Sequence, residues 1–230
     1  MDGKFVVGVM GTQNTGKSTF IHDILYEFSE TSMQFRTVGC DYRKKIEEKG
    51  LRINRTGNLM SQRIIMDTLL EQLDIIGKMP DGNYITDRTP LDAYVYTIYL
   101  QRHRPELGIT EQNLDGFLAD VLDSLGKYDA LIFLDLDDCG NVEVVDDKFR
   151  DTDLDYRREI DGIFKEVLNR ILDMPQYGGT LKRILKRGMK GTREERVGQF
   201  LESQCGNFKI DSEWKDRERL LALQDENKVV

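Results

Sequence analysis

The sequence predicts an α/β fold in which helices pack around a parallel β-sheet. Two observations support this prediction. A continuous apolar run over 5–10 is typical of a strand buried on both faces of a parallel sheet, and a helical pattern of apolar residues begins soon after it, at Lys17. Strand-like and helix-like segments then alternate along the chain, as expected for consecutive βα units. The 230 residues include 39% hydrophobic side chains, which is sufficient for a substantial core.

Three further strands are expected after the first. Side chains alternate over 33–39, which predicts the second strand. The turn Pro80-Asp81-Gly82 leads into a short third strand over 83–86. The segment 130–136 is the most strand-like of all, because it is almost entirely apolar. The residues that follow it, 137–153, are acidic, polar and without period, so we expect no regular element there.

The expected helices are marked by apolar residues three or four positions apart and by capping residues. Asn58 is suited to cap a long helix, and Pro90 is suited to the first turn of another. We expect helices over 17–29, 41–49, from 58, from 90, over 111–125, 154–172 and 194–203, and a charged helix near Trp214. No internal repeat or linker interrupts 1–230, so we expect one domain.

Composition and charge exclude several classes of protein. The 41 acidic and 33 basic residues give a net charge of −8, which opposes a general affinity for nucleic acid but allows a local basic groove. Cys40, Cys139 and Cys205 form no Cys-x-x-Cys pair, so any metal should be a hard cation bound by oxygen. No apolar run is long enough for a membrane span, and the N-terminus does not resemble a signal peptide. We therefore expect a cytoplasmic protein.

A phosphate-binding loop is the strongest motif in the chain. Residues 11–18, GTQNTGKS, match G-x-x-x-x-G-K-[S/T] completely, and they lie between a buried strand and a helix as the motif requires. Glycines allow backbone N–H groups to turn toward an anion, Lys17 reaches the β- and γ-phosphates, and Ser18 can bind Mg²⁺. We therefore predict a site for ATP and Mg²⁺ that consists of Gly11, Asn14, Thr15, Gly16, Lys17, Ser18 and Thr19.

Asp87 and Arg88 follow the third expected strand, at the edge of the sheet where ligands bind in open α/β folds. Asp87 could hold Mg²⁺ or take a proton from an attacking hydroxyl, and Arg88 could bind phosphate. The alternative is a helix-capping aspartate and a surface arginine. Asp135, which follows the run of apolar residues from 130, is a rival for the acidic residue of the site. We prefer Asp87 because Asp-Arg-Thr after a strand is typical of kinases.

Two other groups of charged residues are candidates. Asp41 and Arg43 follow the second expected strand, so Asp41 could be the general base and Arg43 could clamp an acceptor phosphate; an ordinary polar helix start is the alternative. Arg150, Arg157 and Arg158 follow the acidic segment. In a lid they would neutralise charge on the transferred group, whereas the alternative is ion pairing on a solvated helix.

The order of these segments resembles that of the P-loop nucleoside and nucleotide kinases. The likeness extends over about 3–203 and rests on the segments GTQNTGKS, CDYRKKIEEKGLRIN, YITDRTPLDAYVY, LIFLDLDD, VVDDKFRDTDLDYRREID and GTREERV. It is strongest to the family around bacterial nicotinamide-riboside kinase, which includes many bacteriophage proteins. The resemblance implies a three-layer α/β/α fold with a five-stranded parallel sheet in the order 2-3-1-4-5, a lid over about 137–158 and a C-terminal helical extension over about 204–230.

The resemblance also implies an ATP- and Mg²⁺-dependent phosphotransferase that acts on a hydroxyl of a nucleoside, nucleotide or similar molecule. That family commonly has Glu three positions before the arginine that matches Arg43, where this chain has Cys40. The DYR run is similar to phage polynucleotide 5′-kinase, in which an acid and an arginine serve the acceptor. A DNA kinase acting on a 5′-hydroxyl or a hydroxymethylated base is therefore an alternative, which a basic patch over 182–193 favours and the net charge opposes.

A third alternative is an NTP-hydrolysing switch that binds another protein. No Asn-Lys-x-Asp guanine-binding motif is present, which opposes a GTPase. The partners expected under these alternatives are a small-molecule acceptor, DNA, another protein or a second copy of the chain, and none of them involves a membrane.

Overall fold

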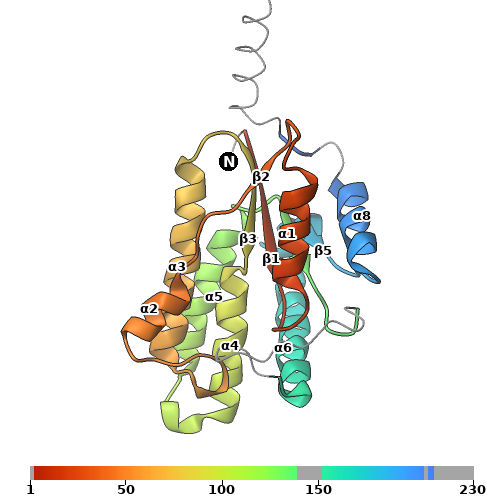
Figure 1. Cartoon of the computed structure of the whole chain (residues 1–230). Coiled ribbons are helices and arrows are strands. Elements are labelled where there is room, and N and C mark those ends of the chain that lie inside the picture. Colours follow the sequence, from red (N-terminus) through yellow and green to blue (C-terminus); the bar gives the residue numbers. More distant parts are fainter. Residues whose placement is uncertain (1–2, 139–151, 205–206, 210–230) are drawn as a thin grey trace, which may run out of the picture.

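A computed structural model of the chain describes residues 3–138, 152–204 and 207–209. At its centre lies a five-stranded sheet flanked by helices on both faces (Figure 1). The strands are β1 (Lys4–Met10), β2 (Phe35–Arg36), β3 (Gly82–Asp87), β4 (Ala130–Phe133) and β5 (Leu185–Lys186). All neighbouring pairs are parallel, and the order is β2-β3-β1-β4-β5, as the resemblance implies.

The helices in chain order are α1 (Lys17–Glu27), α2 (Tyr42–Glu48), α3 (Leu59–Lys78), α4 (Pro90–His103), α5 (Glu111–Leu125), α6 (Leu154–Leu172), α7 (Gly178–Ile184) and α8 (Arg193–Gln204). Two 3-10 turns, η1 (Asn54–Thr56) and η2 (Pro105–Leu107), complete the elements. The expected caps are confirmed. The Asn58 side chain accepts a hydrogen bond from the Ser61 backbone N–H at 2.9 Å, and Pro90 is the first residue of α4. The charged helix expected near Trp214 lies outside the described residues.

The sheet separates two apolar clusters, because successive residues of each strand face opposite sides. In β1, Val6 and Met10 pack with the helices α2 to α7, whereas Val7 and Val9 pack with α1 and α8. These strand residues are fully buried, as the continuous apolar run predicts. The result is a layer of helices on each face, which holds the carboxyl ends of the strands in fixed positions.

The second strand is much shorter than the seven-residue segment expected over 33–39. Only Phe35 and Arg36 pair with β3. Before them, the side-chain amide of Asn83 donates to the carbonyls of Met33 and Gln34, at 3.2 and 3.3 Å. A side chain therefore takes the place of the backbone hydrogen bonds that would have extended the strand.

Two other differences concern the far edge of the sheet. The strand expected over 130–136 ends at Phe133, and the Leu136 N–H donates to the Asp161 carboxylate on α6 instead of to a strand. The fifth strand, β5, has two residues and no clear pattern of its own, so periodicity did not identify it.

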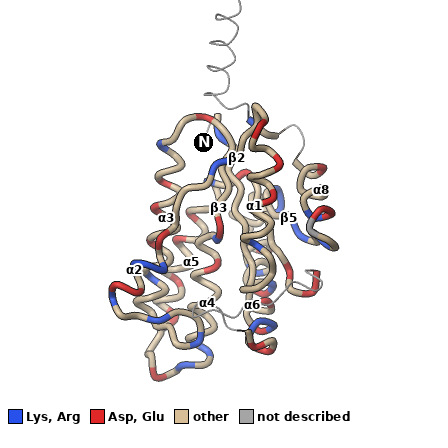
Figure 2. The backbone as a smooth tube through the Cα atoms, viewed as in Figure 1, with Lys and Arg blue, Asp and Glu red and all other residues tan. Residues whose placement is uncertain are grey.

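Charged residues lie mainly on the helices and loops, and the central strands carry few of them (Figure 2). Among the described residues, no helix has the length and apolar character that a membrane span needs.

Candidate active site

The loop between β1 and α1 has the backbone shape that its glycines predict. Gly11 has a φ of 139°, and a Cβ atom at this position would lie 2.6 Å from the carbonyl oxygen of Leu134. Gly16, which precedes the first residue of α1, has a φ of 80°. Both values are strained for any residue with a side chain, so both glycines are required by the backbone. Asn14, with a φ of 55°, adopts the left-handed conformation that asparagine tolerates best after glycine.

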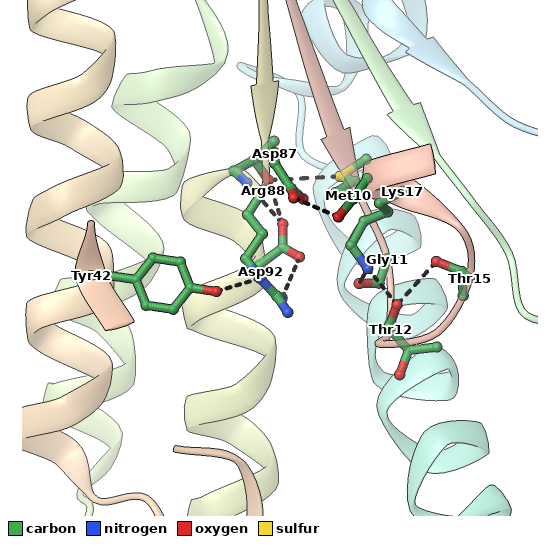
Figure 3. A network of polar contacts seen from close by, with 11 residues as sticks. Met10, Gly11, Thr12, Thr15, Lys17, Tyr42, Asp87, Arg88 and Asp92 are labelled. Atoms are coloured by element: carbon green, nitrogen blue, oxygen red, sulfur yellow. Dashed lines mark hydrogen bonds and ion pairs between the residues drawn. The ribbon is translucent and has the colours of Figure 1, made fainter. Parts of the chain in front are cut away.

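Lys17, the first residue of α1, folds back over this loop (Figure 3). Its Nζ donates to the carbonyl of Gly11 at 2.9 Å and to that of Thr12 at 2.5 Å. Its side chain is largely buried, with 7% exposure. A charge held in this way lies at the loop itself instead of in solvent, as phosphate binding requires.

Ser18 and Asp87 form the oxygen-rich part of the site. The Ser18 hydroxyl donates to Asp87 Oδ2 at 2.9 Å. The contact follows from the parallel register, in which Asp87 at the end of β3 lies beside Val9, near the end of β1. A hydroxyl and a carboxylate are ligands that Mg²⁺ prefers, so these two groups fit the ion that the phosphate loop implies.

Asp135 occupies a different environment from Asp87. Its carboxylate lies 3.0 Å from the ammonium of Lys165, which also pairs with Asp137 and Asp161 at 3.1 and 2.8 Å. Although burial acts to lower the pKa of Lys165, these three carboxylates raise it. The lysine therefore holds the acidic cluster together, and Asp87 is the carboxylate bonded to the phosphate loop.

Arg88 is directed away from solvent, and its side chain is 15% exposed. Its Nε donates to the Tyr42 hydroxyl at 3.0 Å, and its Nη1 lies 3.2 Å from Asp92 (Figure 3). The guanidinium also lies over the ring of Tyr96, 5.7 Å from the centroid. Its backbone has a φ of 87°, which is strained for an arginine. Strain of this kind persists only where surrounding contacts fix it, and it is concentrated at functional sites.

Asp92 is the carboxylate that neutralises Arg88. It is 1% exposed, and its Oδ2 accepts hydrogen bonds from the backbone and the hydroxyl of Thr89 at 2.9 and 3.1 Å. Burial raises the pKa of Asp92, and the neighbouring Arg88 guanidinium acts in the opposite direction. The sequence contains a signal for this residue, since Thr89 and Asp92 form a capping box at the start of α4.

A pocket with about 310 Å³ of empty volume opens beside Arg88. It is built from α2, η1, α3 and α4, and its lining consists of Tyr42, Ile53, Asn54, Gln62, Ile65, Arg88, Asp92, Ala93 and Tyr96. Gln62 is 1% exposed, and its Oε1 accepts no hydrogen bond among the described residues. A buried carbonyl oxygen of this kind is costly unless a ligand supplies a donor, so the pocket is suited to a molecule that carries N–H or O–H groups.

Asp41 and Arg43 lie next to this pocket in sequence but are absent from its lining. Asp41 is exposed, and its side chain does not cap α2. Arg43 is half-buried, with its guanidinium 5.9 Å from the Tyr42 ring centroid. Cys40, at the position of the family's glutamate, has a pKa raised to about 11 by burial, although a backbone hydrogen bond from Tyr42 and the charge of Arg88 act to lower it. Cys40 is therefore a neutral thiol near pH 7.

The arginines after the acidic segment lie in different environments. Arg157 is 6% exposed and donates to the carbonyls of Gln13 and Asn14, at 3.2 and 3.0 Å. Arg158 is exposed and lies 3.8 Å from Asp155 on the same helix. Arg150 and most of the expected lid, 139–151, lie outside the described residues, as does most of the expected C-terminal extension. One further arginine, Arg196 of α8, donates to the Thr15 carbonyl at 3.2 Å. This residue was not identified from the sequence.

The basic patch over 182–193 lies toward the opposite edge of the sheet from the pocket. It extends over α7, β5, the following loop and the first residue of α8, next to β4, whereas the pocket is built beside β3 and β2. Lys190 pairs with Asp138 at 3.1 Å, and Arg187 donates to Asn169 at 3.3 Å. The patch therefore does not form part of the pocket.

No family model matches this sequence, and no curated protein matches it. Solved structures do match. NadR in complex with NAD and AMP-PNP gives a TM-score of 0.56 at 13% identity, over 86% of this chain and 49% of that one. Deoxyadenosine kinase from M. mycoides with bound dATP gives 0.54 at 12% identity, over 86% and 98%. Thymidylate kinase from Ehrlichia chaffeensis gives 0.58 at 14% identity, over 87% and 98%.

This chain spans about half the length of NadR and nearly the whole of the other two proteins. At such low identity the likeness concerns the fold. The chain has the fold of the P-loop nucleotide kinases, which agrees with the resemblance seen in the sequence and with the observed strand order.

Proposed function

We propose that this chain is a kinase that uses ATP and Mg²⁺ to phosphorylate a hydroxyl group of a nucleoside or nucleotide. The observation that carries the proposal is the continuity between the phosphate loop and the neighbouring pocket. Asp87 is bonded to Ser18 of the loop, and the next residue, Arg88, lines the pocket. A phosphoryl group bound at the loop and an acceptor in the pocket would therefore meet at these two consecutive residues.

The loop supplies the groups that bind the donor nucleotide. Backbone N–H groups and the N-terminus of α1 attract the phosphates, and Lys17 carries a positive charge at the same place. Ser18 and Asp87 are suited to bind Mg²⁺, which when bound neutralises charge on the β- and γ-phosphates. These groups would hold the γ-phosphorus in a fixed position.

In the transfer step, the acceptor oxygen forms a bond to the γ-phosphorus and the bond to the bridging oxygen of ADP breaks. The proton of the acceptor hydroxyl passes to a carboxylate, for which Asp87 and Asp41 are the candidates. Because the transition state is loose, positioning and neutralisation of charge contribute more than proton removal. Lys17 and Arg88 are the cations that serve this purpose next to the loop and the pocket. We expect Arg150 and Arg158 to contribute from the lid, whereas Arg157 binds the carbonyls of Gln13 and Asn14 in the loop itself.

The chemistry of the pocket supports a small acceptor with a planar ring. Two tyrosine side chains, Tyr42 and Tyr96, provide aromatic walls, and the amide of Gln62 offers an acceptor for a hydrogen bond. Deoxyadenosine kinase, which has a similar fold, was solved with bound dATP, and this agrees with a nucleotide as a ligand of the proposed enzyme. The separation of the basic patch from the pocket weakens the case for DNA.

The proposal is tested by measuring ATP consumption and transfer of labelled phosphate over a panel of nucleosides, mononucleotides and DNA oligomers, including oligomers with hydroxymethylated bases. We expect one group of nucleosides or nucleotides to become phosphorylated, and Lys17→Ala to abolish that transfer. Transfer only to DNA would identify a DNA kinase. ATP hydrolysis at one rate with every acceptor would instead indicate an NTP-hydrolysing switch.

A further inference from the structure

Cationic side chains bind five consecutive backbone carbonyls of the phosphate loop. Lys17 binds the carbonyls of Gly11 and Thr12. Arg157, from α6, binds those of Gln13 and Asn14, and Arg196, from α8, binds that of Thr15 at 3.2 Å. The loop is therefore enclosed by cations that come from three separate helices.

These contacts determine which way the peptide groups of the loop point. In a trans peptide, the carbonyl of one residue and the N–H of the next point in opposite directions. A cation that holds the Thr15 carbonyl on the outside of the loop therefore holds the Gly16 N–H toward the inside. Inward N–H groups are what a phosphate-binding loop needs.

The peptide between Thr15 and Gly16 has particular need of such a contact. Gly16 has a φ of 80° and no Cβ atom, so its own sterics do not restrict the peptide to one orientation. The Thr15 side chain does not provide the restraint, since its hydroxyl donates to the carbonyl of Thr12 at 3.0 Å. The bond from Arg196 to the Thr15 carbonyl is therefore well placed to supply it.

Arg196 is itself held in place. It is 7% exposed, and its Nε donates to the carbonyl of Gly191 at 3.3 Å, in the loop that precedes α8. On the same helix, Phe200 packs edge-to-face against Phe20 of α1, with ring centroids 5.9 Å apart. A buried guanidinium on a helix that packs against α1 can define a position in the loop more sharply than a solvated side chain can.

We propose that Arg196 is a positioning residue of the phosphate loop, which orients the peptide between Thr15 and Gly16 for nucleotide binding. The inference rests on the proposed use of this loop to bind ATP. Arg196 acts through the backbone of the loop and does not contact the reacting atoms. Its loss should therefore weaken ATP binding and leave acceptor binding in the pocket unchanged.

The test compares Arg196→Ala, Arg196→Lys and Phe200→Leu with the unaltered chain. Calorimetry measures the Kd of a non-hydrolysable ATP analogue with Mg²⁺, and thermal unfolding measures stability. We expect Arg196→Ala to raise this Kd on the order of tenfold, as for a lost hydrogen bond from a charged group. The Kd of Arg196→Lys should lie between those of the unaltered chain and Arg196→Ala, because lysine keeps the charge but lacks the planar guanidinium group. Free guanidinium ion should restore part of the binding to Arg196→Ala.

Phe200→Leu is the matched control, since it weakens the packing of α8 without removing a bond to the loop. We expect it to lower Tm and to leave the Kd unchanged. An unchanged Kd in Arg196→Ala, or an equal rise in Kd in Phe200→Leu at the same loss of Tm, would overturn the inference. Should Arg196→Ala fail to fold, an unchanged Kd in Arg196→Lys and Arg196→Gln would overturn it as well.

The Kd of the ATP analogue, taken together with the panel of acceptors described above, separates this inference from the proposed kinase function. If the unaltered chain binds the ATP analogue but phosphorylates no acceptor, the kinase proposal fails while the predicted effect of Arg196 on binding is retained. If the unaltered chain binds no nucleoside triphosphate, both fail together.

Discussion

Ser18 and Asp87, which are 69 residues apart in the chain, are joined by a hydrogen bond of 2.9 Å at the carboxyl end of the sheet. Ser18 belongs to the first turn of α1 and Asp87 to the end of β3. Parallel pairing of β1 with β3 brings the ends of the two elements together. This contact connects the phosphate loop to Asp87, the residue before Arg88, which lines the pocket. It is the basis for our proposal that the phosphoryl donor and the acceptor meet at these two residues.

Replacement of Lys17 should abolish turnover with little change in stability. Lys17 bonds to the backbone carbonyls of Gly11 and Thr12 in the loop and belongs to neither apolar cluster, so Lys17→Ala removes a charge near the phosphates without opening the apolar core. We expect kcat to fall by on the order of 10²-fold or more. Steady-state kinetics and thermal unfolding measure the two effects, and a kcat equal to that of the unaltered chain would contradict the role of the loop.

Replacement of the two candidate carboxylates, Asp87 and Asp41, should affect phosphoryl transfer and ATP hydrolysis differently. Asp87→Asn should reduce both phosphoryl transfer and background ATP hydrolysis, by on the order of 10²-fold, because it alters the group bonded to Ser18. Asp41→Asn should slow transfer because it removes the second candidate base. It should leave the slow hydrolysis nearly unchanged, since Asp41 is exposed and has no place in the pocket lining. Both rates are measured for each variant. Abolished transfer in Asp41→Asn, with most transfer retained in Asp87→Asn, would move the base to the segment after β2.

Gln62→Met should separate stability from function. Methionine has a similar shape but lacks the buried Oε1 that accepts no hydrogen bond among the described residues, so the free energy of unfolding should stay the same or increase. If this oxygen accepts a hydrogen bond from the acceptor, the KM of the acceptor should rise on the order of tenfold, and the KM of ATP should not change. Urea unfolding and two-substrate kinetics provide the measurements. Equal changes in both KM values would exclude a role confined to the pocket.

Cys40 should react slowly in the folded protein. Burial raises the pKa of its thiol to about 11, so at pH 8 the reactive thiolate should be on the order of 100-fold scarcer than in a free cysteine. Alkylation with iodoacetamide, followed by peptide mass mapping, measures this rate at Cys40. The same reaction in urea is the control. Modification of folded Cys40 at the rate seen in urea would contradict the prediction.

The raised pKa of Cys40 also predicts how stability depends on pH. The native state binds the thiol proton more tightly than the unfolded state, so this contribution is complete below the ordinary pKa of 9.0 and is lost as the pH rises to about 11. Cys40→Ala should therefore lose less stability between pH 9 and pH 11 than the unaltered chain. Unfolding in urea across that interval gives the comparison.

Local patterns in the sequence determined the parts of the fold that depend on neighbours in the chain. The apolar run that forms β1, the phosphate loop, and the caps at Asn58 and Pro90 were all predicted and are all observed. In each case, the backbone conformation depends on residues within one or two turns. The strand order was available only through the resemblance to kinases. The two-residue strand β5 was missed because two residues show no periodicity.

Tertiary structure alone decided which side chains line the pocket and contact the phosphate loop. Tyr42, Gln62 and Tyr96 come from three different helices and meet only when α2, α3 and α4 pack on one face of the sheet. Arg157 and Arg196 reach the loop across 144 and 181 residues of chain. A sequence pattern indicates which face of a helix is apolar, but a hydrogen bond depends on where two separate backbones come to lie. The phosphate loop and Arg157 could therefore be identified from the sequence, whereas the lining of the pocket, the role of Arg196 and the contacts of both arginines with the loop required the folded chain.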